Sequence, residues 1–231
     1  MNTEIIKTKY GYLSVKDLPT QNELETYYAQ KYYQDDSTQY SHEYSKDELK
    51  YFNNKAEVAE FIYHSLFKNK NKDLLEVGAG EGFFANYLLH KNWDVTTMDY
   101  SDYGIKNHNP LLLNSLIKGD IFQSLSKLTS QEKTFDLVNL SNVLEHVIDP
   151  IDLPEKLKGL LSNESLLRIS VPNDYSNFQK FLLEKEYSTN TWLCVPDHLH
   201  YFTFESLANL LSSLGYEIVT NMGEFPIELY L

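Results

Sequence analysis

The chain has 231 residues, of which 42% are hydrophobic, together with a formal net charge of −13 and a single cysteine. This length and apolar content predict one ordinary domain with a large core, whereas the negative charge argues against DNA or RNA as a partner, because the average field repels a polyanion. One cysteine excludes an internal disulfide and a cysteine-based metal cluster, and without a basic leader or an apolar run of about 18 residues we expect a cytoplasmic protein with no membrane span.

Residues 1–50 differ from the rest of the chain in their tyrosine content. Ten of the 18 tyrosines lie at or before Tyr63. Pro19-Thr20 predicts the start of one helix, and the capping-box pattern at residues 45–48 predicts the start of a second. We interpret residues 1–50 as a helical lid. Most of its tyrosines are expected to pack the helices onto the core, and one or two near Tyr40–Tyr51 are expected to reach the ligand.

The stretch Leu74–Gly82 is the most informative segment of the chain. An apolar run is followed by glycines at 78, 80 and 82, in the pattern G-x-G-x-G. Phe83 stands where the dinucleotide fingerprint G-x-G-x-x-G has its third glycine. Glycine allows positive φ and leaves no Cβ between backbone and ligand, so the pattern predicts a buried strand that leads into a ligand-binding loop. The partly positive N-terminus of the next helix points at the same place, where it suits a carboxylate.

Three further segments end an apolar stretch with polar residues. Asp99 ends the predicted strand 93–99 and lies 21 residues after Gly78, about where a doubly wound fold has the carboxylate that accepts from both ribose hydroxyls. Asp120 ends the shorter stretch 116–120, and the last segment is Phe135–Val147.

In this order and spacing, the four segments resemble the class I S-adenosylmethionine (SAM)-dependent methyltransferases over roughly residues 50–225. Within that superfamily the chain is similar to small-molecule methyltransferases with a Leu-Glu-His-Val segment after strand four, here Leu144–Val147. The resemblance implies an α/β fold with a doubly wound, mostly parallel, seven-stranded sheet. It also implies a methyltransferase core at 51–231 that follows the lid, and SAM as a cofactor that leaves as S-adenosylhomocysteine (SAH).

The resemblance assigns the methionine end of SAM to one group of residues. The loop Gly78-x-Gly80-x-Gly82 would wrap the methionine part. Glu76 would help to hold its amino group. The backbone near Leu140 would contact the same end of the cofactor.

A second group is assigned to the adenosine end. Asp99 would take the ribose, and Tyr100 would flank the adenine. Asp120 would reach the adenine amino group, with Ile121 packing on the ring.

The core is predicted to alternate strands and helices. Strands are predicted at 73–78, 93–99, 115–119, 135–141 and 165–171. Helices are predicted at 82–91, 101–107, 121–129, 152–162 and 204–214. Two further strands, at 217–220 and 225–229, would complete the seven, the last of them antiparallel by analogy with the superfamily. Whether the natural chain extends beyond Leu231 stays open.

Residues 172–202 follow the fifth strand at the carboxyl ends of the sheet, where open α/β sheets bind their ligands. They are longer than a linker requires, and we expect them to wall the acceptor pocket. A neutral hydroxyl needs a base for methylation, and histidine suits that role because its pKa is about 6.5.

Three histidines are candidates for the base. His146 would lie beside the SAM methyl by resemblance. Its alternative role is to orient its loop by a hydrogen bond to the backbone, with Glu145 holding the other ring nitrogen or capping the next helix. His198 and His200 alternate and would share one face of an extended segment. One of these two is expected to line the pocket, with Asp197 orienting whichever histidine acts. As a pair they are weak evidence for a metal, so no metal is predicted.

The N-terminal segment, the Leu144–Val147 motif and residues 197–202 together resemble methyltransferases of bacterial surface-polysaccharide and nucleotide-sugar pathways. The resemblance implies O-methylation of a small-molecule acceptor, a sugar, nucleotide sugar or related phosphorylated metabolite of capsule or lipopolysaccharide synthesis. Two alternatives stay open, namely methylation of a phenol, amine or carbon acid, and a SAM-binding sensor or partner subunit without catalysis. The methylated atom and the oligomeric state, a homodimer included, also stay open.

Overall fold

The computed structural model describes residues 4–32, 43–68 and 72–223. The chain divides into two compact units. Among the described residues, the sheet unit contains 29–32, 43–68, 72–141 and 156–169. The second unit contains 4–28, 142–155 and 170–223. No helix in the described ranges combines the length and the apolar character that crossing a membrane requires.

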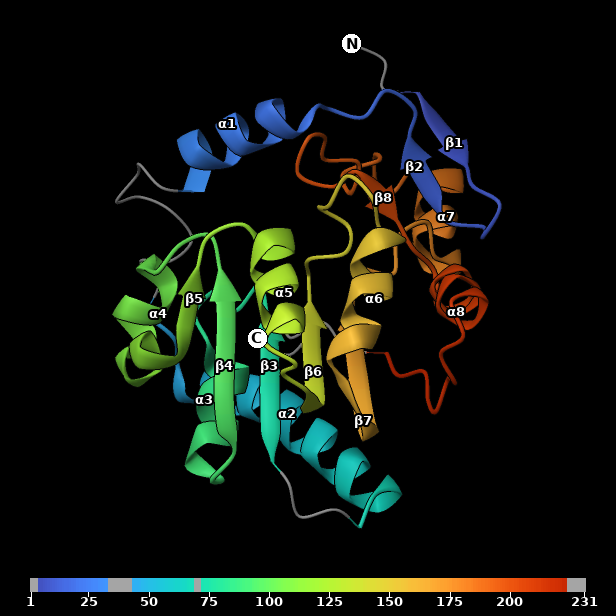
Figure 1. Ribbon diagram of the computed structural model, residues 1–231. Helices are drawn as coiled ribbons and strands as arrows, with labels where there is room; N and C mark the ends of the chain where they lie inside the picture. Colours follow the sequence, from blue (N-terminus) through green and yellow to red (C-terminus); the bar gives the residue numbers. More distant parts are fainter. Residues whose placement is uncertain (1–3, 33–42, 69–71, 224–231) are drawn as a thin grey trace. The chain divides into compact units, whose positions relative to one another are not determined.

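The sheet unit is built on five strands in the order β5-β4-β3-β6-β7 (Figure 1). These strands are β3 (Asp73–Val77), β4 (Asp94–Asp99), β5 (Leu116–Lys118), β6 (Phe135–Ser141) and β7 (Leu161–Ser170). β3 pairs in parallel with both β4 and β6, and β4 pairs in parallel with β5. Strand order therefore reverses between β3 and β6, and such a switch point is where open α/β sheets bind their ligands.

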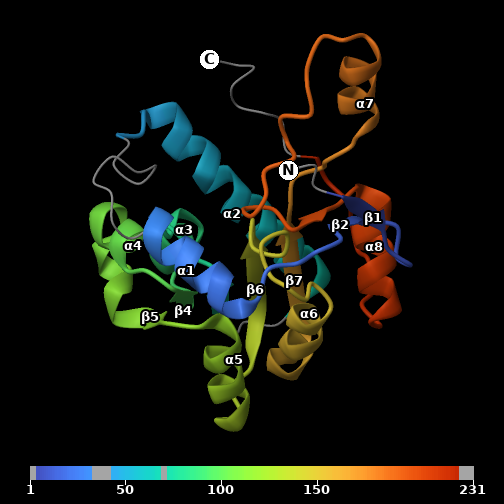
Figure 2. The same ribbon diagram turned by 90° about the horizontal axis from the view of Figure 1, so that it is seen from above.

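Helices cover both faces of this sheet. Figure 2 shows α2 (Lys46–Leu66) and α3 (Phe83–His90) on one face and α5 (Ile121–Ser130) on the other. Between β4 and β5 lie α4 (Tyr103–His108) and the 3-10 helix η2 (Pro110–Ser115). Tyr63 of α2 is fully buried and packs edge-on against Trp93. The core beneath α2 and α3 is therefore continuous with the sheet.

The second unit carries a small antiparallel sheet in the order β1-β2-β8. Its strands are β1 (Ile5–Lys7), β2 (Leu13–Val15) and β8 (His200–Tyr201), with Leu13 opposite Tyr201. The remaining α-helices of the described ranges are α1 (Gln21–Tyr32), α6 (Asp152–Leu157), α7 (Asn177–Glu184) and α8 (Phe204–Ser213). Thr203 caps the N-terminus of α8, and Gly215 follows its C-terminus with φ of 85°.

The structure confirms the doubly wound α/β fold and corrects the predicted number of strands. Residues 217–220 form no strand, while residues 225–229 lie outside the described part of the chain. The described sheet thus has five strands rather than seven. Val219 is 48% exposed, and a β-prone sequence without neighbours to pack against does not become a strand on its propensity alone.

Two other predictions also need correction. The helix expected at 152–162 ends at Leu157 and continues only as the 3-10 turn η3 (Lys158–Leu160), so β7 begins at Leu161. Gly159 lies in that turn, and glycine is a poor residue for a helix interior. The N-terminal segment is not helical throughout either, because β1 and β2 come before α1.

Candidate functional site

The glycine loop connects β3 to α3. Gly78, Gly80 and Gly82 all have positive φ, of 71°, 56° and 76°, a conformation that glycine adopts without the strain a side chain would add. The N–H groups of Gly78 and Ala79 both donate to the carbonyl of Met98, each at 2.9 Å. The loop is therefore tied to the end of β4 by its own backbone.

Two of these glycines serve different purposes. A Cβ built on Gly80 would meet no other atom within 4 Å, whereas one on Gly82 would lie 2.6 Å from Cδ1 of Leu112. A Cβ on Gly104 of α4 would in turn lie 2.6 Å from the carbonyl oxygen of Gly80. The packing requires glycine at 104, and a Cβ at 82 would need Leu112 to move, while the space beside Gly80 is open.

Glu76 on β3 is an internal brace in this structure. It is 4% exposed; its Oε2 accepts from the N–H of Ala85 at 3.0 Å and its Oε1 accepts from the amide of Asn139 at 2.9 Å. Burial raises the pKa of Glu76 to about 7, against the effect of these hydrogen bonds. The N-terminus of α3, expected to receive a carboxylate from a ligand, thus already accommodates one from the protein.

A polar network beside Glu76 was not predicted from the sequence. Arg168 donates through Nη1 to Oδ1 of Asn139 at 2.8 Å and to Oγ of Ser141 at 2.6 Å, and its guanidinium lies 5.5 Å from the centre of the Phe84 ring. A signal was available, because Arg168 is the only arginine in the sequence and Asn139 interrupts an apolar strand.

Asp99 occupies the carboxyl end of β4, as predicted. Its Oδ2 accepts from the N–H of Gly80 at 2.8 Å, and its Oδ1 accepts from the N–H of Ser101 at 2.9 Å. Burial raises the pKa of Asp99 above its usual value. The carboxylate assigned to the ribose therefore also holds the open glycine of the loop.

Two of the three residues assigned to the adenine contact each other. The hydroxyl of Tyr100 donates to Oδ2 of Asp120 at 2.6 Å, and Oδ1 of Asp120 accepts from the N–H of Gln123 at 2.7 Å as the N-cap of α5. Ile121 is the first residue of that helix and is 6% exposed. Leu140 is buried on β6, where it pairs with Val77.

Tyr44 also belongs to the surroundings of the loop. Its hydroxyl donates to Oε1 of Glu81 at 2.6 Å, and its ring meets those of Phe52 and Phe83 edge-on, with centroids 5.2 and 5.1 Å away. Burial raises the pKa of Tyr44 well above its usual value. Among the tyrosines expected near the ligand, Tyr44 contacts a loop residue, whereas Tyr40 lies outside the described part.

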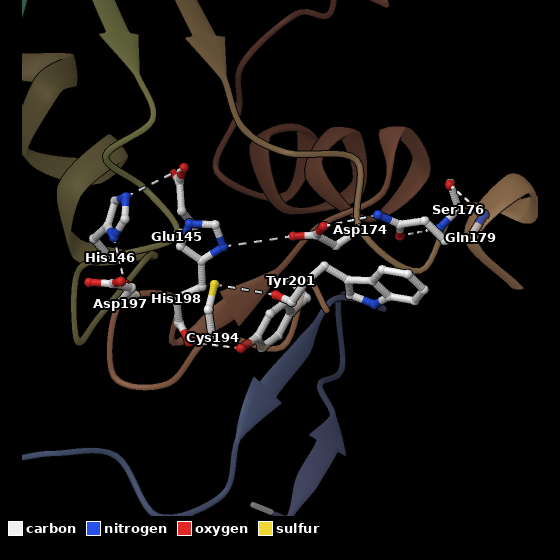
Figure 3. Close-up of polar contacts among 10 residues, drawn as sticks. Glu145, His146, Asp174, Ser176, Gln179, Cys194, Asp197, His198 and Tyr201 are labelled. Atoms are coloured by element: carbon white, nitrogen blue, oxygen red, sulfur yellow. Dashed lines mark hydrogen bonds and ion pairs between the residues drawn. The ribbon is translucent and has the colours of Figure 1, made fainter. Parts of the chain in front are cut away.

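The second unit brings Glu145, His146 and His198 together (Figure 3). Nδ1 of His146 is hydrogen-bonded to the backbone carbonyl of Asp197, and because a carbonyl only accepts, Nδ1 donates. Nε2 of His146 lies 3.7 Å from Oε1 of Glu145. The rings of His146 and His198 are edge-to-face with centroids 4.9 Å apart. We call Glu145, His146 and His198 the Glu-His-His cluster.

Glu145 is the most buried member of the cluster. It is 1% exposed, and neither of its carboxylate oxygens has a hydrogen-bond partner in another described residue. Burial raises the pKa of Glu145 to about 8. Its backbone carbonyl accepts from the N–H groups of Leu199 and His200, at 2.8 and 3.2 Å. The segment that carries His198 is therefore joined to the backbone of Glu145.

His198 has an acidic residue on its other side. Nδ1 of His198 lies 4.0 Å from Oδ2 of Asp174, a residue that is 4% exposed and whose Oδ1 accepts from Nε2 of Gln179 at 3.4 Å. Figure 3 shows His146 and Asp174 on opposite sides of the His198 ring. Sequence reasoning assigned Glu145 only an alternative role, as a partner of His146 or a helix cap, and it assigned Asp174 none, because nothing in a local pattern relates residues 145, 174 and 198.

His200 and Asp197 lie differently from their predicted positions. His200 is 2% exposed, and its Nε2 contacts the carbonyls of Val147 and Ile148 at 2.9 and 3.3 Å, so it does not share a face with His198. Burial lowers its pKa. Asp197 orients His146 through its backbone oxygen, whereas its carboxylate accepts from the hydroxyl of Tyr27 at 2.8 Å.

Comparison with known proteins gives a family and a curated relative. The model of a family described as "Methyltransferase domain" matches residues 49–221. A protein of Methanocaldococcus jannaschii described as "Uncharacterized protein MJ0638" is 32% identical over 146 residues. That match covers 59% of this chain and 62% of the relative, so the chain spans less than two thirds of the relative's length.

Solved structures share the fold. A SAM-dependent methyltransferase from Archaeoglobus fulgidus has a TM-score of 0.53 at 22% identity, covering 71% of this chain and 69% of its own. The plantazolicin methyltransferase BpumL in complex with SAH has a TM-score of 0.54 at 22% identity, covering 85% and 70%. At this identity the likeness concerns the fold, which is the Rossmann-like fold of methyltransferases.

Proposed function

The chain belongs to the methyltransferase domain family, and from that premise we propose that it is a SAM-dependent methyltransferase that acts on a hydroxyl group of a small molecule. The main support for this cofactor is the hydrogen bond between the N–H of Gly80 and the carboxylate of Asp99. It joins the open glycine of the loop to the acid assigned to the ribose. SAM, when bound, supplies an activated methyl group on a sulfonium and leaves as SAH.

The residues of the sheet unit fit this cofactor chemically. Asp99 and Asp120 present carboxylates just after two neighbouring parallel strands, and the groups that they would meet, ribose hydroxyls and an adenine amino group, are hydrogen-bond donors. The open side of Gly80 lets a ligand approach the backbone. Glu76, with its pKa raised to about 7, would meet the cationic amino group and be favoured in its charged form there.

We assign activation of the acceptor hydroxyl to the Glu-His-His cluster. A hydroxyl must lose its proton as its oxygen takes the methyl group, and positioned imidazoles are common acceptors of such protons. His200 is excluded from the role, because its Nε2 is engaged by two backbone carbonyls in the interior of the second unit.

A sugar, free or as a nucleotide sugar, is the acceptor class that we propose. Its support is the likeness of the N-terminal segment, the Leu144–Val147 motif and residues 197–202 to methyltransferases of surface-polysaccharide pathways. The net charge of −13 also disfavours polyanionic polymers as acceptors.

Incubation with SAM carrying a labelled methyl group tests the proposal. The acceptors to compare are a panel of nucleotide sugars and sugar phosphates, a catechol and a primary amine, with product mass as the readout. Label on a sugar oxygen is the expected result. Label only on the phenol or amine contradicts the acceptor class, and SAM binding without transfer to any acceptor favours a sensor or partner subunit.

A further inference from the structure

We propose that Glu145, His146 and His198 form a binding site for one divalent transition-metal cation, with Zn²⁺ as the best fit. Two imidazole nitrogens and one carboxylate oxygen are a ligand set that catalytic zinc sites use, and other first-row divalent ions accept the same set. All three residues belong to the second unit, so the site is complete within it.

The distances suit closure around an ion. One ligand atom from each of the three residues lies within 4.8 Å of the others. Around a zinc ion with bonds of about 2.1 Å, ligand atoms are about 3.4 Å apart. Small side-chain rotations are enough to shorten the separations between the ligand atoms of Glu145, His146 and His198 from within 4.8 Å to about 3.4 Å.

The contacts outside the cluster are those that hold imidazoles for metal binding. A ligating histidine typically donates its other ring N–H to a carbonyl or carboxylate, which fixes its tautomer and orientation. Nδ1 of His146 donates to the carbonyl of Asp197, so Nε2 carries the lone pair, and it faces Glu145. Nδ1 of His198 lies 4.0 Å from Asp174, which is itself held by Gln179. His146 thus has an outer hydrogen bond of the expected kind, and His198 has a carboxylate within ion-pair distance.

The buried carboxylate of Glu145 is the strongest argument for a bound cation. A carboxylate that is 1% exposed and has no hydrogen-bond partner in another described residue is costly to keep in the interior. Within the described part of the chain, the imidazoles of His146 and His198 lie near this carboxylate. A cation between the three residues satisfies the carboxylate and uses both imidazoles at once.

A three-ligand site leaves a coordination position open for an oxygen of another molecule. We assign that position to the acceptor hydroxyl, whose proton an adjacent cation makes more acidic. This role rests on the proposed function, whereas binding of the ion does not. The ion would then activate the acceptor hydroxyl. Without an ion in the cluster, a histidine would perform that activation.

Calorimetric titration of the chelator-stripped full chain with Zn²⁺, without SAM or acceptor, tests the site. We expect one ion per chain, and at least a 10-fold loss of affinity in each of Glu145→Gln, His146→Ala and His198→Ala. His90→Ala is the matched control, because His90 is exposed and bonded to its own helix at Asn86, and its affinity should equal that of the wild type. No binding to the wild type, or equal binding by the three variants, overturns the proposal.

A second measurement keeps the test independent of variant folding. In NMR spectra of the wild type, Zn²⁺ should shift the imidazole signals of two of the seven histidines. The signals of His90 and His64, assigned by comparison with His90→Ala and His64→Ala, should stay unshifted. Shifts at other histidines instead contradict the site. If Zn²⁺ does not bind but His146→Ala abolishes turnover, the metal proposal fails and the proposed function stands. If Zn²⁺ binds at the cluster and no acceptor is methylated, the metal proposal stands and the proposed function fails.

Discussion

The hydroxyl of Tyr100 donates a 2.6 Å hydrogen bond to the carboxylate of Asp120. Tyr100 follows β4 directly and Asp120 is the N-cap of α5 just after β5, so one bond links the ends of two neighbouring strands. Two of the three residues that resemblance assigns to the adenine are therefore coupled, and a change at one alters the position of the other.

A double-mutant cycle measures this coupling. Tyr100→Phe should lower the free energy of unfolding by about 1 kcal/mol through loss of the hydrogen bond, and Asp120→Ala should lower it by about 1–2 kcal/mol because the helix cap is lost as well. The loss of unfolding free energy in the double variant should be smaller than the sum of the two single losses by about 0.5 kcal/mol or more. Strictly additive effects in urea unfolding would show that the bond contributes nothing.

Asp99→Ala should weaken SAM binding by about 1.5–3 kcal/mol, since it removes charge-assisted bonds to the ribose and releases the N–H of Gly80. Isothermal titration calorimetry gives the affinity directly. Asp94→Ala is the control, because Asp94 is exposed at the opposite end of the same strand. Unchanged affinity in the Asp99 variant would contradict the placement of the cofactor.

Glu76 should make stability depend on pH. Its folded pKa is about 7 because of burial, well above about 4.3 in the unfolded chain. The unfolded state therefore loses the proton first as pH rises, and stability falls between about pH 4 and pH 7. Between pH 5 and pH 8, the free energy of unfolding of Glu76→Gln should rise by about 2–3 kcal/mol relative to that of the wild type.

Denaturant unfolding at both pH values checks this expectation. Glu164→Gln provides the comparison, because Glu164 is exposed on β7 and should track the wild type. If Glu76→Gln keeps the same pH dependence as the wild type, the carboxyl of Glu76 is not the group responsible.

The histidine variants should separate into two classes. His146→Ala and His198→Ala should retain SAM affinity and lose turnover, because both rings belong to the cluster that we assign to the acceptor. His200→Ala should instead lower the free energy of unfolding by about 1–3 kcal/mol, since it leaves the carbonyls of Val147 and Ile148 without their donor. Full turnover in both cluster variants would end the assignment.

The sheet unit was predictable because its strands are local signals. β3, β4 and β6 are apolar runs that end at glycine or polar residues, and their observed limits differ from the predicted ones by no more than one residue. Asp99 and Asp120 could be placed for the same reason, since each ends a strand or begins a helix.

The second unit was not predictable in the same way. β1, β2 and β8 have two or three residues each, too few to show a period, and β8 pairs with a strand near the other end of the chain. The sequence identified His146 and His198 separately, but their contact joins residues 52 positions apart. Burial of Glu145 and Asp174 depends on that packing, so no local pattern reveals it.

The pairing of Leu13 with Tyr201 has a consequence for how the protein is made. A ribosome that adds about 5–20 residues per second needs about 10–40 s to travel from one partner to the other. During that interval the first hairpin has emerged without its third strand, so nascent chains should be most exposed to chaperones and to proteolysis at their leading end.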